Sequence, residues 1–212
     1  IAFYMLLSGI NYGLLFVAIF KGNIKKIIDD TEFKWYIGIT LLFALLVASS
    51  LFASKQYGFA ESIRQGLFNV ISIITTTGFT ITDYTLWPPF IWMILGFCMY
   101  FGACGGSTSG GAKIIRITIL IKAMRNEFNR ILHPNAVLPI RISDKVLSSS
   151  IKQSVLTFII FMIAIVFVGW FFYIAIGLNI TDAYGTSLAC ISNLGITIGD
   201  HGCNISWDDM PT

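Results

Sequence analysis

The chain has 212 residues, of which 56% are hydrophobic and 12% charged, with a formal net charge of +3 and a mean hydropathy of +0.78. Soluble domains carry about 25% charged residues, so this composition excludes an ordinary soluble protein. The small net charge gives no reason to expect nucleic acid as a partner. Its four cysteines lack metal-site spacing, and we expect most of them to be small apolar residues of the interior.

The first third of the chain alternates apolar runs with charged stretches. Residues 1–20 are mostly apolar, and we expect them to be the end of a membrane span from a preceding unit. A charged loop at 21–34 follows. Residues 35–54 are apolar over about the twenty residues that a bilayer-crossing helix needs. Residues 62–74 are apolar but too short to cross, which predicts a re-entrant half-helix.

The same order of elements then returns. Residues 90–122 form a long apolar stretch that a glycine-rich segment interrupts, and a basic loop at 123–145 follows. Residues 155–178 are a second clean span, and residues 182–191 are again too short to cross. We therefore expect one complete unit over 35–122 and an incomplete unit over 146–212. Because the chain begins inside an apolar run and ends soon after the last loop, we expect a piece of a longer protein.

Each short apolar segment leads into a polar loop, at residues 75–83 and 192–200. Aligning Gly78 with Gly195, an offset of 195 − 78 = 117, also aligns two threonine, two isoleucine and two aspartate positions: Thr80 with Thr197, Ile81 with Ile198, and Asp83 with Asp200. Lipid offers no partners to a bare backbone, so such loops persist at membrane depth only where they line water or protein. One copy alone is open to an alternative interpretation as a surface turn. Two copies in one topological position favour a pair of ion-selectivity loops.

Loops of this kind select cations for a physical reason. The C-terminal end of a half-helix carries free carbonyl groups and a partial negative charge, which stabilise a cation near the membrane centre. The following residues turn carbonyl oxygens inward to replace the water shell of the ion, and glycine allows that turn. Asp83 and Asp200 would stand at the outer mouth, either concentrating cations or simply capping the loops.

The distribution of basic residues predicts the orientation. Most Lys and Arg residues lie near 21–34 and 122–152, and basic loops stay on the cytoplasmic side. Both polar loops then enter from the external face and return to it.

The glycine-rich interruption reads Gly105, Gly106, Ser107, Thr108, Ser109, Gly110, Gly111, Ala112 and Lys113. It is not a phosphate-binding loop, because Ala112 stands where that motif requires lysine. A non-helical segment at this depth is expected to line a cavity beneath the polar loops, where it acts as a gate. The alternative is a packed kink in a helix. Lys113 and Arg116 either reach the cytoplasmic interface or face the pore, and the sequence leaves both open.

These motifs resemble the superfamily of K⁺ transporters that includes TrkH, KtrB and the plant HKT proteins, with bacterial TrkH the most similar. The resemblance implies an all-α membrane fold built from repeats of span, re-entrant pore helix and span, with extended filter loops. It also implies a K⁺ filter whose backbone carbonyls bind the ion without a cofactor. Its positions here are Thr76, Thr77, Gly78, Phe79, Asn193, Leu194, Gly195 and Ile196.

The resemblance further implies a multi-pass protein of the bacterial inner membrane, surrounded by membrane lipid. It implies a homodimer with a cytosolic nucleotide-binding regulatory subunit similar to TrkA or KtrA. An alternative from another class is a membrane enzyme that acts on a lipid or phosphate substrate through the glycine-rich loop and Asp83. The sequence shows no paired base, metal cluster or nucleophile–histidine arrangement to support that alternative.

Overall fold

The computed structural model describes residues 1–22, 24–133, 139–142 and 145–199. The described residues are mostly helical, which confirms the predicted all-α fold class. The helices are α1 (Ala2–Ser8), α2 (Tyr12–Lys21), α3 (Lys25–Asp29), α4 (Thr31–Ala53), α5 (Phe59–Ile74), the 3-10 turn η1 (Tyr84–Leu86), α6 (Pro89–Phe101), α7 (Ile114–Leu132), α8 (Ser149–Ile176) and α9 (Ile180–Ser192). The two-residue strands β1 (Arg141–Ile142) and β2 (Lys145–Val146) form a small antiparallel hairpin.

Two helices of the described part, α4 and α8, are by themselves long and apolar enough to cross a membrane. Their N-termini are defined by side-chain caps: Asp30 accepts from the backbone N–H of Glu32 at 2.9 Å, and Ser148 accepts from that of Ile151 at 3.4 Å. In contrast, α5 has 16 residues and α9 has 13. At 1.5 Å per residue they are about 24 and 20 Å long, shorter than the bilayer core of about 30 Å.

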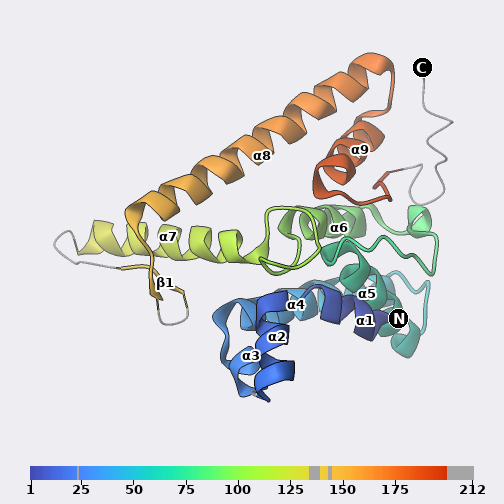
Figure 1. Cartoon of the computed structure of the whole chain (residues 1–212). Coiled ribbons are helices and arrows are strands. Elements are labelled where there is room, and N and C mark those ends of the chain that lie inside the picture. The colour runs from blue at the N-terminus through green and yellow to red at the C-terminus, as the bar shows by residue number, and fades with distance from the viewer. Residues whose placement is uncertain (23, 134–138, 143–144, 200–212) are drawn as a thin grey trace.

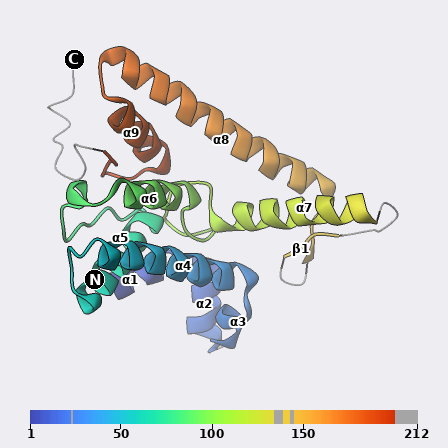
Figure 2. The same ribbon diagram turned by 180° about the vertical axis from the view of Figure 1, so that it is seen from behind.

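Each short helix packs along the long helix that precedes it, α5 along α4 and α9 along α8. Helix α6 contacts α4, α5 and α9 and so joins the two pairs, while α7 extends away from α6 and α8 returns from near its far end to α9 (Figures 1 and 2). The main core lies among α4, α5 and α6 and includes the buried residues Val47, Leu51, Ile74, Leu95 and Met99. Phe161 and Phe171 on α8 are more than half exposed, as expected for a helix whose outer face meets lipid.

The structure differs from expectation at residues 1–20, which do not form one straight helix. Helices α1 and α2 meet at an angle of 101°. The bend is stabilised by the Asn11 side chain, which accepts a hydrogen bond from the backbone N–H of Gly13 at 2.8 Å and so begins a new helix.

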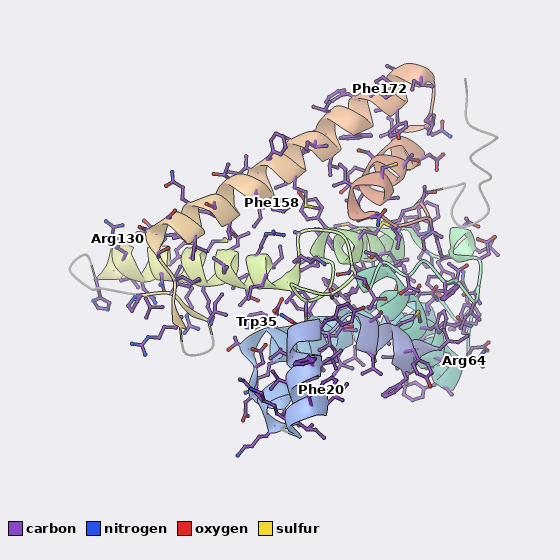
Figure 3. The ribbon with its side chains drawn as sticks, viewed as in Figure 1. Phe20, Trp35, Arg64, Arg130, Phe158 and Phe172 are labelled. Carbon is purple, nitrogen blue, oxygen red and sulfur yellow. The ribbon has the colours of Figure 1, made fainter. Side chains whose placement is uncertain are left out.

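A second difference concerns the basic segment at 123–145. Helix α7 continues to Leu132, so the first part of the expected loop is helical. Lys122 donates to the carbonyl of Arg141 at 2.7 Å, which ties the small hairpin to this helix. Arg130, near the end of α7, and Arg64, on α5, lie at opposite ends of the molecule (Figure 3).

Candidate functional site

The two polar loops begin with the same backbone turn. Thr76 and Asn193 both adopt the left-handed conformation, with φ of 52° and 57°. The next N–H in each loop returns to the carbonyl five residues earlier: Thr77 donates to Ser72 at 2.9 Å, and Leu194 donates to Ala189 at 2.9 Å. This is the hydrogen bond that closes many helix C-termini. The equivalent positions differ by the same offset that aligns Gly78 with Gly195.

The hydroxyl groups at the helix ends repeat as well. Thr75 donates through Oγ1 to the carbonyl of Ile71 at 2.7 Å, and Ser192 donates through Oγ to the carbonyl of Leu188 at 2.7 Å. Both side chains are buried, and each stands three positions before its glycine. The sequence comparison matched the residues after the glycines and missed this pair. A search for hydroxyl residues of either kind, rather than for identity, would have found it.

The two glycines lie side by side. A Cβ atom built on Gly78 would lie 3.9 Å from the backbone nitrogen of Gly195 and 4.0 Å from Leu194 Cδ1. Gly78 has φ of 78°, a conformation that favours glycine, whereas Gly195 is unstrained and has open space beside it. Phe79 is 58% exposed, and Ile196 is partly buried. The structure thus brings the two predicted filter loops together, with their tips on the surface of the described chain.

A buried tyrosine joins the residues that follow the two loops. The hydroxyl of Tyr84 donates to the carbonyl of Thr197 at 2.6 Å, and Tyr84 itself is fully buried. Its own carbonyl accepts from the indole N–H of Trp92 at 2.8 Å. Sequence reasoning missed this link, because nothing local marks two positions 113 residues apart as partners.

Of the two predicted outer-mouth aspartates, Asp83 lies within the described residues. The carboxylate of Asp83 accepts from the backbone N–H of Thr85 at 2.9 Å and from its hydroxyl at 2.6 Å, and so caps η1. This geometry matches the capping alternative. Asp200 lies outside the described residues.

The glycine-rich segment forms a closed loop between α6 and α7. The N–H of Ala112 donates to the carbonyl of Tyr100, and the N–H of Ile114 donates to that of Ala103, both at 3.0 Å, which brings the two ends of the loop together. Inside the loop, the hydroxyl of the buried Ser109 accepts from the N–H of Ala103 at 3.0 Å. Figure 1 shows this loop at the centre of the molecule, where α6 and α7 meet.

This loop contacts both polar loops through one residue. The N–H of Gly110 donates to Thr76 Oγ1 at 3.0 Å. A Cβ atom built on Gly110 would overlap the carbonyl oxygen of Ser192, so only glycine fits there. The glycine-rich loop is therefore seated against the start of each predicted filter loop.

The two cations at the end of the loop fold back onto the protein. The ammonium of Lys113 donates to the carbonyl of Ser107 at 3.0 Å and also to the carbonyl of Ser109. Arg116 donates to the carbonyl of Ala112 at 3.1 Å, and its guanidinium lies 4.1 Å from the ring centroid of Phe158 on α8 (Figure 3). Both cations therefore have partners within the protein, Lys113 in the loop and Arg116 in the α7–α8 pair.

Comparison with known proteins gives consistent matches along the whole chain. Residues 1–210 match the family TrkH, described as cation transport protein. The chain is 35% identical over 208 residues to the Trk system potassium uptake protein TrkH of Salmonella typhimurium and to that of Escherichia coli, covering 94% of this chain and 41% of each relative. The crystal structure of the potassium transporter TrkH from Vibrio parahaemolyticus superposes with a TM-score of 0.91 at 31% identity, covering 99% of this chain and 45% of that chain. The chain therefore spans less than half the length of these relatives.

Proposed function

Because the chain belongs to the TrkH family of cation transport proteins, we propose that it forms part of a pore that conducts K⁺ across a membrane, as the pore-forming subunit of a K⁺ uptake system. One observation carries the proposal. Two loops with matching turns and matching hydroxyl contacts meet at Gly78 and Gly195, each directly after a helix too short to span a bilayer.

The chemistry follows from the helix ends. The C-termini of α5 and α9 direct partial negative charge toward the loops, which favours a cation there. The carbonyl oxygens of the four residues in each loop then replace the water shell of K⁺. Those residues are Thr76, Thr77, Gly78 and Phe79 in the first loop and Asn193, Leu194, Gly195 and Ile196 in the second.

The glycine-rich loop from Gly105 to Lys113 is the gate of this pore. It touches the first residues of both loops through Gly110, so its position is coupled to theirs. Its ring is fixed at the ends, and residues 105–111 carry no large side chain, which lowers the cost of a change in their conformation.

The protein works in the plasma membrane of a bacterial cell. There it forms a homodimer, and a cytosolic nucleotide-binding subunit of the TrkA or KtrA kind regulates it. Asp83 and Asp200 attract cations to the outer mouth. The family favours this transport function over the enzyme alternative.

The gate is tested by deleting Ser107 and Thr108 in the full-length transporter, reconstituted in liposomes. The shortened loop no longer reaches Thr76, so K⁺ flux rises, dependence on the regulatory subunit falls, and the K⁺/Na⁺ ratio stays the same. Thr108→Ala, which changes an exposed side chain, is the matched control. Unchanged flux, or lost selectivity at unchanged flux, would favour the packed kink instead. Absence of K⁺ flux above empty vesicles in the unmodified protein would reject the transport function.

A further inference from the structure

A buried carboxylate lies beside the glycine-rich loop. Glu32 occupies the first turn of α4 and is 6% exposed. Buried carboxylates are costly in any protein and more so in one that spans a membrane, so they persist where they have partners and a task. The ion selection and gating proposed above do not involve Glu32.

Its partners come from the two ends of the loop. A carboxylate oxygen of Glu32 accepts a hydrogen bond from the backbone N–H of Gly105. Burial disfavours the negative charge of Glu32, and the nearby backbone of Ile115, in the first turn of α7, and the ammonium of Lys113 act in the opposite direction. One side chain of α4 thus connects the start of the loop to the start of the helix that leaves it.

A second element fixes the same part of the loop from another side. The N–H of Cys104 donates to the carbonyl of Gly9 at 3.1 Å, and the N–H of Tyr12 donates to the carbonyl of Gly106 at 3.2 Å. The bend between α1 and α2 is therefore hydrogen-bonded to residues 104–106. This explains why the bend is positioned where it is.

The far side of the loop is attached differently. Gly110 donates to Thr76 and packs closely against the carbonyl of Ser192, and Lys113 holds the carbonyls of Ser107 and Ser109 from within the loop itself. Among the described residues, positions 104–106 are thus hydrogen-bonded to α4 and to the α1–α2 bend, whereas positions 107–111 reach the polar loops through Gly110 and otherwise bond to residues 103, 104 and 113 of the same segment.

We propose that Glu32 is the positioning residue that fixes the hinge of the glycine-rich loop, so that residues 107–111 move relative to residues 104–106 when the pore opens. This inference rests on the proposed gating function. It assigns to α4 the task of keeping the loop beneath the polar loops in the closed state. Without the carboxylate, Gly105 loses its hydrogen bond to α4, and the closed state becomes less stable relative to the open state.

The test uses Glu32→Ala and Glu32→Gln in the full-length transporter, with K⁺ and Na⁺ flux measured with and without the regulatory subunit. Loss of one charge-assisted hydrogen bond changes an equilibrium by about ten-fold. We expect Glu32→Ala to raise K⁺ flux without the subunit by about that factor, at an unchanged K⁺/Na⁺ ratio. Glu32→Gln, which keeps an acceptor oxygen, should give a smaller rise. Glu61→Ala, an exposed glutamate in the first turn of α5, is the matched control.

A purely structural role predicts the opposite direction, namely less folded protein and lower flux in proportion. If Glu32→Ala does not fold, Glu32→Gln decides the matter, and wild-type flux and regulation in that variant overturn the proposal. The deletion of Ser107 and Thr108 distinguishes failure of the proposed gate from failure of the proposed hinge. If the deletion leaves flux unchanged, the gate itself is wrong. If the deletion raises flux and the Glu32 variants do not, only the hinge is wrong.

Discussion

Gly110→Ala is the substitution that most directly perturbs the contact between the glycine-rich loop and the polar loops. The added methyl group would occupy the position of the Ser192 carbonyl oxygen, so one of the two must move. Ser192 ends α9, and its hydroxyl is bonded to the carbonyl of Leu188 at 2.7 Å. Gly110 belongs to a non-helical loop whose bond to the polar loops is its N–H to Thr76 Oγ1. We therefore expect the loop to move.

The size of the effect follows from two terms. Overpacking by one methyl group costs about 1–3 kcal/mol. The lost hydrogen bond to Thr76 adds about 0.5–1.5 kcal/mol. Together they raise the free energy of the seated loop by about 1.5–4.5 kcal/mol, which shifts the equilibrium away from the seated position at least about ten-fold.

The assay is K⁺ and Na⁺ flux through the full-length transporter in liposomes, with the melting temperature in detergent as a folding control. Gly110→Ala should raise K⁺ flux and leave the K⁺/Na⁺ ratio unchanged. Gly38→Ala is the matched control, because Gly38 lies within α4, is exposed and has no atom within 4 Å of its Cβ position. Flux equal to that of the control variant would refute the reasoning. So would a loss of selectivity, since it would show that Ser192 had moved instead of the loop.

Three further predictions test the surroundings of the site. Tyr84→Phe removes the buried hydroxyl that donates to the Thr197 carbonyl, so we expect a loss of stability of about 1–3 kcal/mol, measured as a lower melting temperature, and a lower K⁺/Na⁺ ratio. Wild-type values of both quantities would show that this hydrogen bond does not position the loops. Lys113→Met frees the carbonyls of Ser107 and Ser109, so K⁺ flux should rise, while equal flux would show that the ammonium does not hold the loop. Residues 1–212 supply two polar loops and span less than half the length of their relatives, so liposomes with this fragment alone should carry no K⁺ flux above empty vesicles. Measurable flux would contradict that expectation.

Much of this architecture was predictable because it depends on residues that are close together in the sequence. The length of an apolar run distinguishes spans from half-helices, and in both copies a Thr–Ile pair that begins two positions after the glycine marks the repeat. The all-α membrane fold and the family assignment are both confirmed. The structure adds that equal backbone turns precede Gly78 and Gly195, where the residues themselves differ. Threonine and asparagine both adopt the left-handed conformation here, so geometry is retained without identity.

Other features were not predictable because they depend on distant partners. The bend between α1 and α2 depends on hydrogen bonds to Cys104 and Gly106, far along the chain. The contact between Glu32 and Gly105 joins residues 73 positions apart, and the sequence shows Glu32 only as one charge among several in a polar stretch. For Asp83 the sequence left a cap and a cation-attracting role open, and the distant fold was needed to show that its side chain caps η1. No local pattern distinguishes such residues from their neighbours.

The central claim is that the loops at Gly78 and Gly195 select the ion, and side-by-side K⁺ and Na⁺ uptake by Gly78→Ser and Gly195→Ser in the full-length transporter tests it most directly. Both variants should lower the K⁺/Na⁺ ratio, because a hydroxymethyl group at either glycine would enter the proposed path of the ion. Gly78→Ser should also lower stability by about 1–2 kcal/mol, since its φ is positive, whereas Gly195→Ser should not. Gly58→Ser, unstrained and with open space around its Cβ position, should change neither property. An unchanged ratio in both filter variants would contradict the account.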